Sequence, residues 1–512
     1  MKNESGKTIS IWMETAEKFP TDGKLLADAH ADVCIVGAGI AGMTTAYLLA
    51  REGKRVVVLE NGVVGGGMTG RTTAHLFNAM DDRFYELERL HGEKGARMAA
   101  ESHTAAIDRI EAIIRAEHID CDFERLDGYL FAPPEEGQHD LEKELDAAHR
   151  AGLIDVEHVQ RAPLQGFDTG RCLRFPRQAQ FHPLKYLAGL TKAVRRDGGK
   201  VYTRMHATDI EGGHPARIKT SDGYLVTADA VVVATNTPVN NLFAIHTKQA
   251  AYLSYVIGAR VPSGSVNKAL YWDTLDPYHY VRLQHMQDDH GAYDMLIVGG
   301  EDHKTGQADD ADVRFAALEQ WARVRFPMIE NIQMQWSGQV MEPIDGLAFI
   351  GHNPLDQPNV YVATGDSGQG MTHGTIAGIL LTDLIMGREN AWQTLYDPAR
   401  ITLLALPEFL HHNLNVAAQY TDLVSGGDVQ STQEVIAGEG AVIRRGLKKV
   451  AVYRDDEGAL HECSAVCVHL GGIVSWNSKE KTWDCPCHGS RFNAYGKVFQ
   501  GPANRDLPQA DS

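Results

Sequence analysis

Cysteine, positive charge and long apolar runs are all scarce in this sequence. Seven cysteines in 512 residues are too few for a disulfide-stapled scaffold. The 67 Asp and Glu residues outnumber the 49 Lys and Arg residues, and the net charge of -18 would repel nucleic acid and anionic lipid. No apolar run approaches the roughly 20 residues that span a bilayer, and the N-terminus lacks the apolar core of a signal peptide. We therefore expect a globular cytoplasmic protein with no nucleic-acid partner and no membrane span.

A glycine pattern follows the first apolar run, residues 31–36. Gly37, Gly39 and Gly42 fit G-x-G-x-x-G. In this motif the first glycine permits a tight turn, the second lets the backbone approach a pyrophosphate, and the third lets the next helix pack on the strand. The next apolar run ends in Glu60, whose carboxylate can accept ribose hydroxyls. This order of strand, turn, helix and strand predicts a dinucleotide site.

Three further segments have the composition of nucleotide-contacting loops. Residues 65–73 form a glycine- and threonine-rich loop, residues 230–236 form an apolar strand that ends in a small polar turn, and residues 365–372 form a glycine-rich loop before a helical pattern. Any one of them alone is compatible with an ordinary glycine turn. Their order along the chain favours a shared role.

With these segments in this order, residues 30–390 resemble the D-amino-acid-oxidase-like FAD family, which includes glycine, sarcosine and γ-glutamylputrescine oxidases. The resemblance implies an α/β, Rossmann-like fold of the two-dinucleotide-binding-domain type with FAD as its cofactor. Outside residues 65–70, which belong to the glycine- and threonine-rich loop named above, no second G-x-G-x-x-G motif is present, which argues against a second site for NAD(P)H. The candidate FAD-contacting residues are Gly37, Gly39, Gly42, Glu60, Gly70, Arg71, Thr72, Thr235, Gly368, Gly370, Met371 and Thr372.

Strand-like runs between residues 240 and 335 predict an antiparallel sheet that is inserted into the α/β domain and carries the substrate side. The candidate catalytic residues there are Tyr252, His279, Tyr280 and Arg282. Strand alternation places Tyr280 and Arg282 on one face and His279 on the other. The resemblance implies that an Arg and a Tyr on this sheet grip a substrate carboxylate, which the guanidinium fork matches. The alternative is aromatic packing with Arg282 paired to a local acid.

Four of the seven cysteines lie close together near the C-terminus, and two of them alternate with histidines. Cys467 and His469 form C-x-H, and Cys485 and His488 form C-x-x-H after fifteen intervening residues. This donor set suits a [2Fe-2S] cluster in which two cysteines hold one iron and two histidines hold the other. A structural zinc site is the alternative for the same residue types. With the glycines and proline around these motifs, residues 430–508 resemble the Rieske family.

The sequence departs from the respiratory Rieske pattern at two places. Cys487 stands where those proteins have one of two extra cysteines, but Gly472 occupies the position of the other, so we expect no loop-to-loop disulfide and a free buried thiol at Cys487. Ser490 matches a residue that donates a hydrogen bond to cluster sulfur, whereas Phe492 replaces a tyrosine that donates a second one. Fewer donors stabilise the reduced cluster less and lower its potential.

These motifs divide the chain into two domains. We expect an FAD-dependent oxidoreductase at 1–415, with a discontinuous FAD domain and a substrate domain mainly at 240–335, then a linker at 416–427 and a small all-β Rieske domain at 428–512. Because every FAD-contacting segment precedes Ser425, we expect a chain that ends there to bind FAD.

Three functions are compatible with this arrangement. The first is oxidation of an amine or amino-acid-like molecule, with electrons passing from the flavin through the cluster to an external carrier. The second reverses the flow, so that the cluster reduces the flavin for a reductive or oxygen-dependent reaction. The third is a redox-responsive electron-transfer protein without a small substrate of its own.

Overall fold

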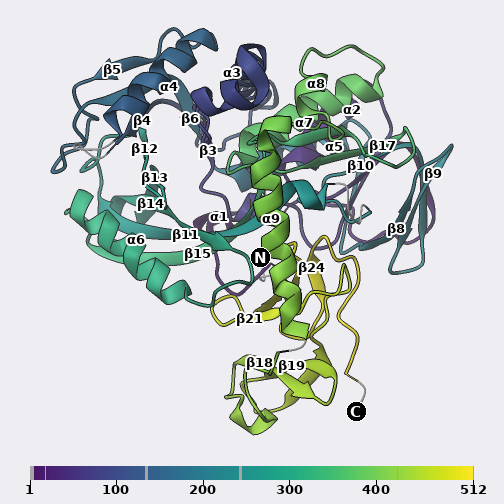
Figure 1. Cartoon of the computed structure of the whole chain (residues 1–512). Helices are drawn as coiled ribbons and strands as arrows, with labels where there is room; N and C mark the ends of the chain where they lie inside the picture. The colour runs from purple at the N-terminus through teal and green to yellow at the C-terminus, as the bar shows by residue number, and fades with distance from the viewer. Residues whose placement is uncertain (1–4, 18, 133–136, 241–244, 424, 511–512) are drawn as a thin grey trace.

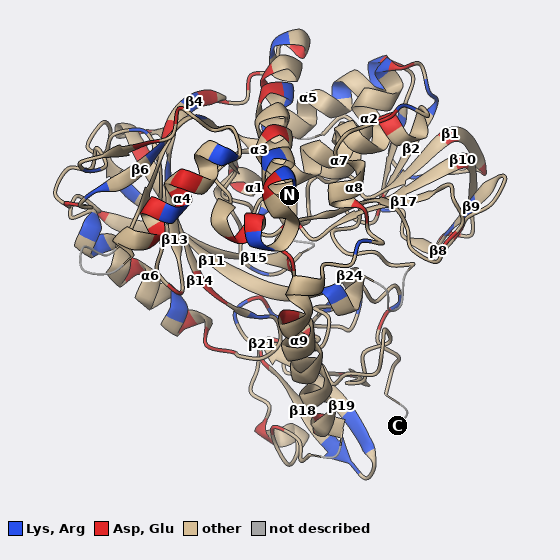
Figure 2. Ribbon diagram, turned by 45° about the horizontal axis from the view of Figure 1, so that its top comes forward, with Lys and Arg blue, Asp and Glu red and all other residues tan. Residues whose placement is uncertain are grey.

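The computed structural model describes residues 5–17, 19–132, 137–240, 245–423 and 425–510. The chain forms a large α/β body and a smaller β-rich lobe below it, and helix α9 (Leu406–Gln419) runs from one to the other (Figure 1). Acidic and basic residues are interspersed along the elements of the body (Figure 2). Within the described residues, no helix combines the length and the apolar character needed to cross a membrane.

The first sheet of the body is the predicted dinucleotide-binding sheet. Within the described residues it has eight strands in the order β16-β17-β10-β1-β2-β7, with β9 paired to β10 and β8 to β9. Its central strand β1 runs parallel to both β2 and β10, and its last four residues are buried. A continuous apolar run of this kind is typical of a parallel strand that is covered on both faces. The strands are β1 (Ala29–Val36), β2 (Val56–Glu60), β7 (Lys200–Thr203), β8 (Ala207–Glu211), β9 (Ala216–Thr220), β10 (Leu225–Val233), β16 (Phe349–His352) and β17 (Val360–Thr364).

Two helices that follow glycine-rich loops pack against each other beside this sheet. They are α2 (Ile40–Arg51) and α7 (Gly370–Ile385). A Cβ atom at Gly374 would lie 2.5 Å from the Ile40 side chain, and one at Gly378 would lie 2.4 Å from the Thr44 side chain. The glycines of α7 therefore allow the close approach that brings both helix N-termini to the same end of the sheet.

The second sheet is the predicted substrate sheet, and it is larger than the 240–335 segment. Within the described residues it has nine strands in the order β15-β11-β14-β13-β12-β4-β6-β3, with β5 paired to β6. All these pairs are antiparallel except β12 with β4. The strands are β3 (His75–Leu76), β4 (Glu124–Phe131), β5 (Glu157–Val159), β6 (Cys172–Gln180), β11 (Gln249–Pro262), β12 (Leu270–Asp273), β13 (His279–Asp288), β14 (Gly291–Lys304) and β15 (Asn331–Pro343).

The remaining helices cover these sheets and connect the parts. They are α1 (Ile11–Thr15), α3 (Phe84–Glu117), α4 (Gln138–Arg150), α5 (Pro183–Arg196), α6 (Ala311–Arg325) and α8 (Gln393–Tyr396), with short 3-10 helices η1 (Met68–Gly70), η2 (His246–Lys248), η3 (Leu403–Ala405), η4 (Tyr420–Leu423) and η5 (Thr432–Glu434).

The C-terminal lobe is the predicted all-β domain. Its described residues form a three-stranded antiparallel sheet and a four-stranded antiparallel sheet. Much of the predicted linker is helical, because α9 extends to Gln419 and η4 follows it; residue 424, like residues 241–244 of the predicted substrate domain, lies outside the described residues. The strands are β18 (Gly440–Arg445), β19 (Lys448–Arg454), β20 (Leu460–Ser464), β21 (Ser475–Asn477), β22 (Thr482–Asp484), β23 (Arg491–Asn493) and β24 (Val498–Gln500).

Candidate active site

A cavity of about 290 Å³ lies between the two sheets of the body and receives the ends of both glycine-led helices. The turn after β1 forms one wall. Gly37 has a φ of +106°, and a Cβ atom there would lie 2.3 Å from the backbone oxygen of Ala234 at the end of β10. At this wall the backbone itself faces the cavity, as a pyrophosphate site requires.

Glu60 closes the same end of the cavity. It stands at the end of β2, and its carboxylate accepts hydrogen bonds from the backbone nitrogens of Ala38 at 2.7 Å and Gly62 at 2.9 Å. These contacts fix the carboxylate beside the glycine turn, which is where the ribose of a bound dinucleotide would lie.

Most of the predicted FAD-contacting residues line this cavity, and three support it from behind. Gly42 packs α2 on the glycine turn, since a Cβ there would lie 2.0 Å from the backbone oxygen of Gly37. Gly70 packs in the same way against Gly65, and Thr372 bonds to the backbone of Gln369. The lining residues among those predicted are Gly37, Gly39, Glu60, Arg71, Thr72, Thr235, Gly368, Gly370 and Met371.

The side chain of Arg71 joins the body to the lobe. Its guanidinium is fully buried and forms an ion pair of 3.3 Å with Glu480, in the turn between β21 and β22. It also donates to the backbone oxygen of Ser337 at 2.8 Å and of Thr8 at 2.9 Å. Arg71 lines the cavity, where the resemblance implied a flavin contact, and its charge also anchors the C-terminal lobe.

The lobe also completes the cavity, which the sequence patterns did not predict. Six of its residues between Val498 and Asn504 line the cavity wall. Asn504 reaches across the junction, where its amide donates to the backbone oxygen of Thr208 at 3.1 Å and its own backbone oxygen lies 3.1 Å from the His206 ring. Residues from both parts of the chain therefore line the cavity.

At the substrate end, only Tyr280 of the four predicted catalytic residues lines the cavity. Its hydroxyl lies 2.7 Å from the Ser254 hydroxyl, and Tyr278 lies beside it with the two rings 5.6 Å apart. A Cβ at Gly299 would lie 2.2 Å from the Tyr280 ring, so this glycine makes room for it. Trp272 adds an apolar surface to the same wall.

Arg282 lies two residues further along β13 and turns into the core. Its guanidinium is fully buried and donates to the backbone oxygens of Ala74 at 2.9 Å and Phe181 at 3.0 Å. Burial lowers the pKa of Arg282 to about 9. His279 lies between the carboxylates of Asp273 and Glu301 and stacks on Trp321, and Tyr252 is also outside the cavity lining. Arg282 does not line the cavity, and both of its terminal nitrogens are bonded within the fold, Nη1 to backbone oxygens and Nη2 to Gln284.

Carboxylates that the sequence patterns did not single out gather at this end. Asp81 and Asp366 line the cavity, and Glu342 and Asp302 are close enough to influence them. Burial raises the pKa of Asp81 to about 7 and of Asp366 to about 6. Burial also raises the pKa of Glu342 well above its ordinary value. The side chain of Asp81 is only half-buried, because the cavity admits water. The surrounding protein nevertheless disfavours the charged form of its carboxyl.

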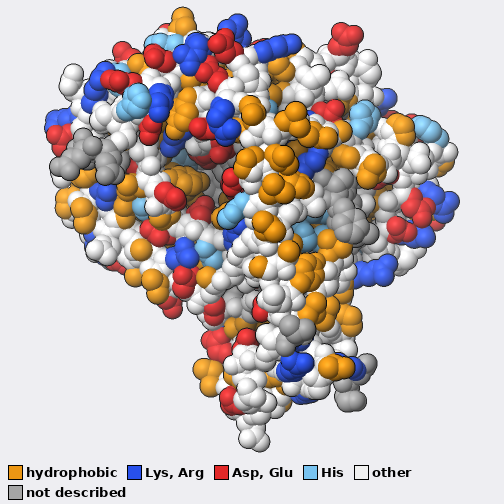
Figure 3. Space-filling view, in the orientation of Figure 1, with side chains coloured by type: hydrophobic (Ala, Val, Ile, Leu, Met, Phe, Trp, Pro, Cys, Tyr) orange, Lys and Arg blue, Asp and Glu red, His pale blue; other side chains and the backbone are white. Residues whose placement is uncertain are grey.

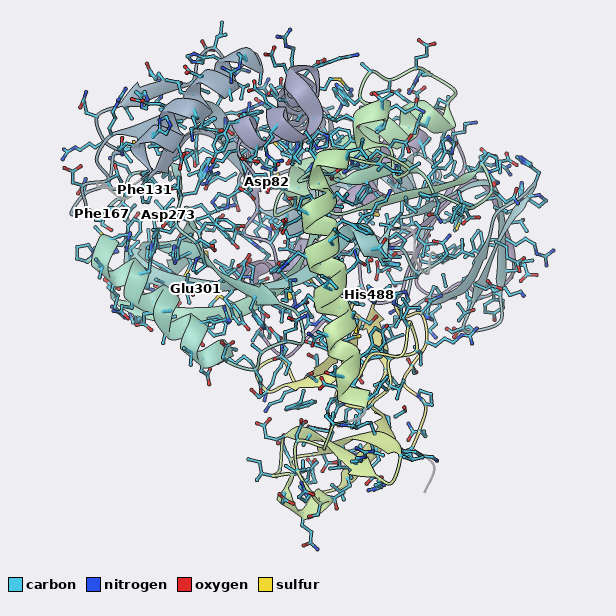
Figure 4. The ribbon with its side chains drawn as sticks, in the orientation of Figure 1. Asp82, Phe131, Phe167, Asp273, Glu301 and His488 are labelled. Atoms are coloured by element: carbon cyan, nitrogen blue, oxygen red, sulfur yellow. The ribbon has the colours of Figure 1, made fainter. Side chains whose placement is uncertain are left out.

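The acidic end of the cavity lies beside a hollow on the surface of the body. Figure 3 shows this hollow with acidic side chains near it. Figure 4 labels Asp82 and Glu301, two acidic residues in this part of the body. Arg83 is the neighbouring positive residue, and its guanidinium donates to the backbone oxygens of Met80 and Asp273. The site therefore presents a predominantly acidic surface to an entering molecule.

The four predicted cluster ligands converge on two tight loops of the lobe. The backbone nitrogen of Gly471 donates to Cys467, and that of Gly489 donates to Cys485, so each loop turns back on its first cysteine. The His469 and His488 rings are perpendicular, with centroids 5.1 Å apart. The thiols of Cys467 and Cys485 are in contact, which together with burial raises the pKa of Cys467.

These residues fit a [2Fe-2S] cluster. Nδ1 of His488 is buried and has no hydrogen-bond partner, which suits a nitrogen that binds a metal. A Cβ at Gly472 would lie 2.5 Å from Sγ of Cys487, so Gly472 does occupy the place opposite that thiol, and Cys487 is a buried, unpaired cysteine as expected. Figure 4 places His488 at the junction between the lobe and the body.

Comparison with known proteins confirms both family resemblances. Residues 32–384 match the family described as FAD dependent oxidoreductase. This chain belongs to that family. Residues 427–511 match the Rieske [2Fe-2S] domain, so the enzyme is an FAD-dependent oxidoreductase with a C-terminal Rieske domain, and its cofactors are FAD and a [2Fe-2S] cluster.

One of the similar proteins matches this chain over nearly the whole length of both chains. YhfW of Bacillus subtilis (strain 168), which carries the name of a Rieske 2Fe-2S iron-sulfur protein, is 32% identical over 98% of this chain and 97% of its own. Gamma-glutamylputrescine oxidoreductase of Escherichia coli (strain K12) is 28% identical over 74% of this chain and 89% of its own. Glycine oxidase from Geobacillus kaustophilus shares the fold, with a TM-score of 0.60 and 19% identity over 73% of this chain and 99% of its own.

Proposed function

We propose that this oxidoreductase is a dehydrogenase for a cationic amine and that it passes electrons from its flavin through its Rieske cluster to an external one-electron carrier. The observation that carries the proposal is the shared wall between the two sites. Residues from Val498 to Asn504 belong to the Rieske lobe and line the flavin cavity. A cluster domain that forms part of the flavin site is suited to exchange electrons with it.

The acidic end of the cavity supports an amine as the substrate. Asp81 and Asp366 face the cavity, whereas Arg282, the residue expected to hold a carboxylate, does not. A positively charged amine would favour the ionised forms of these carboxyls, whereas the negative charge of an α-carboxylate would disfavour them. The relative named gamma-glutamylputrescine oxidoreductase also has an amine in its name.

Each group would have a separate part in the reaction. When bound, FAD would supply the acceptor for the hydride of the amine C–H bond once the ammonium group has lost a proton to water, and the resulting imine is hydrolysed by water. Asp81 and Asp366 hold the positive charge, and Tyr280 orients the substrate through a hydroxyl that Ser254 fixes. Trp272 and Phe77 supply apolar surface that limits the access of water to the reacting carbon.

In the lobe, we propose that Cys467 and Cys485 bind one iron and that His469 and His488 bind the other. The proposal is supported by the convergence of the two loops and by the unpartnered Nδ1 of His488. We further propose a cytoplasmic location, which the cysteines support: all seven lie among the described residues and none is paired, as in a reducing compartment.

Anaerobic mixing tests the proposal. The holoenzyme would be mixed with a panel of mono- and diamines and, in parallel, with α-amino acids, and flavin absorbance and the cluster's paramagnetic signal would be followed. We expect bleaching of the flavin by amines, followed by reduction of the cluster. Bleaching by α-amino acids alone would exclude the cationic-amine assignment.

The reverse direction of electron flow is the second candidate. It is favoured by Phe492, which is buried in the lobe and lacks the hydroxyl that would raise the cluster potential. Redox titration of both centres separates the two directions. Outward flow requires a cluster potential near or above that of the flavin, and a cluster far below the flavin would instead support the reductive reaction.

A further inference from the structure

One histidine of the body contacts both predicted histidine ligands of the lobe. His246 lies in η2, just before β11, and only 1% of its surface is exposed. Its ring lies 4.9 Å from that of His469 at an angle of 79°, and 6.2 Å from that of His488 at 67°. No motif in the sequence pointed to this residue.

The other side of His246 leads to the flavin cavity. Its Nδ1 lies 3.4 Å from the hydroxyl of Thr237, and the backbone oxygen of Thr237 accepts a hydrogen bond of 2.7 Å from the Thr235 hydroxyl. Thr235 lines the cavity and is one of the predicted FAD contacts. Gln249 donates to both Thr237 and Thr364, and Thr364 also lines the cavity.

The two parts approach each other closely around this histidine. A Cβ at Gly489, next to His488, would lie 2.3 Å from the Cβ of Ala251, and a Cβ at Gly306 would lie 2.8 Å from the backbone oxygen of Asp484. Gln339, which lines the cavity, donates to the backbone oxygen of Gly489 at 2.9 Å. The lobe is therefore seated with its cluster loops directly against the body.

We propose that His246 is a positioning residue that couples the histidine-bound iron of the cluster to the flavin site, through ring contacts on one side and the Thr237 hydroxyl on the other. Tunnelling between redox centres weakens steeply across gaps, so a packed ring and a short polar chain between two centres favour transfer. The inference deepens the proposed function, because it names the route by which electrons cross between the sites.

The electron balance of amine oxidation determines how many electrons must pass between the flavin and the cluster. Oxidation of one amine delivers two electrons and releases two protons to water. Each passage through the route removes one electron from the reduced flavin and converts one ferric iron of the cluster to ferrous. Two passages per amine are needed, and an external one-electron acceptor must reoxidise the cluster after each one.

The experiment measures transfer between the two centres without any amine. In the full-length holoenzyme, a flash-generated deazariboflavin radical injects one electron, and the first-order equilibration between flavin and cluster is followed by flavin absorbance. His246→Asn removes the ring, and Thr237→Val removes the hydroxyl while keeping the shape. The matched control is His303→Asn, the same change at a buried histidine of β14 that stacks on Tyr255.

We expect both His246→Asn and Thr237→Val to slow the equilibration about tenfold, the lower end of what loss of a partner outside the ligand sphere typically costs. The cluster's paramagnetic signal and both potentials should stay as in the wild type, and His303→Asn should leave the rate unchanged. This readout does not depend on the substrate or on the direction of flow, so its outcome is separate from that of the amine panel.

Two results would overturn the inference. One is a wild-type rate in His246→Asn with an intact cluster. The other is an equal slowing in His303→Asn, which would indicate a general loosening of the junction. If His246→Asn loses its cluster, Thr237→Val decides, because it contacts no ligand: an unchanged rate there rejects the route.

Discussion

The flavin cavity and the cluster loops are built in opposite ways. The cavity takes residues from Ser5 to Asn504, and its phosphate end is a backbone surface around Gly37 and Gly39. The predicted cluster ligands are four side chains in the single stretch from Cys467 to His488. A site made by side chains should lose its cofactor when one ligand is removed. A site made by backbone should lose its cofactor when an added side-chain atom prevents the backbone from taking up its conformation.

The largest effect is expected from removing one cluster ligand. His488→Ala should abolish the Rieske-type paramagnetic signal and leave two irons unbound, because one iron would keep a single protein donor. Flavin absorbance should remain, since His488 does not line the cavity. Iron and sulfide analysis together with the paramagnetic spectrum checks this, and a retained signal would remove His488 from the ligand set.

On the flavin side, a single methyl group should have a comparable effect. Gly37→Ala combines a φ of +106° with a Cβ 2.3 Å from the backbone oxygen of Ala234. We expect loss of FAD, measured by absorbance of the purified protein, with the cluster signal retained. Gly53→Ala is the control, because Gly53 also has a positive φ of +82° but a Cβ there meets nothing within 4 Å. If Gly53→Ala loses as much FAD as Gly37→Ala, backbone strain alone explains the loss.

The buried pair Arg71–Glu480 tests whether the two sites depend on each other. Glu480→Leu leaves the buried Arg71 guanidinium without its counter-charge, which should lower the free energy of unfolding by about 3–5 kcal/mol. Thermal and urea denaturation measure this, and FAD should be held more weakly because the lobe lines the cavity.

Glu462→Leu supplies the comparison for that change. Glu462 pairs with Arg445 at the exposed surface of the same lobe, and its loss should cost about 0–1 kcal/mol. Equal costs for Glu462→Leu and Glu480→Leu would mean that the interlobe pair contributes little. The same contacts revise the expectation for a chain that ends at Ser425: without Glu480 and the residues after Val498, we now expect it to lose FAD.

A smaller effect is expected at the acidic end of the cavity. The pKa of Asp81 is about 7, so its carboxyl is neutral below that pH and charged above it. The KM for a cationic amine should therefore fall as pH rises through about 7, and Asp81→Asn should flatten this dependence. Because the pKa of Asp81 is raised, its neutral form stabilises the substrate-free protein. This contribution to stability is lost as pH rises through about 7.

The exposed Asp276 provides the control for the pH experiment. Asp276→Asn should keep the wild-type profile of KM against pH. If Asp81→Asn and the wild type have the same profile, the positive charge of the substrate is not held by Asp81.

Sequence spacing predicted the local parts of both sites and missed the contacts between distant segments. The turn at Gly37 and the ligand loops at Cys467 and Cys485 are short patterns in which spacing fixes geometry. Arg71 and Glu480 are separated by 409 positions, and no local pattern relates them. For the same reason His246 and the carboxylate Asp81 carried no signal until the fold brought them to a cofactor site.

The substrate sheet shows a second limit of sequence patterns. Alternation along β13 correctly put Tyr280 and Arg282 on one face, yet Tyr280 reaches the cavity and Arg282 reaches the core beside Phe181. Periodicity shows which residues of a strand share a face, but it does not show which of those residues border a cavity. Strand β4 joins the same sheet from outside the predicted 240–335 segment.

The smallest change concerns the disulfide that the lobe lacks. A Cβ at Gly472 would lie 3.5 Å from the Cβ of Cys487, at the short end of the range of roughly 3.5–4.5 Å found in disulfides. Gly472→Cys should therefore form a disulfide with Cys487 under oxidising conditions, since the Cys487 side chain can rotate to accept it. Closing a loop of about 15 residues should stabilise the lobe by at most about 3 kcal/mol. Thiol titration and denaturation with and without reductant measure both effects. The cluster signal should persist, because neither residue is a ligand; a variant that forms the disulfide but loses the cluster would show that the ligand loops need the freedom that Gly472 gives them.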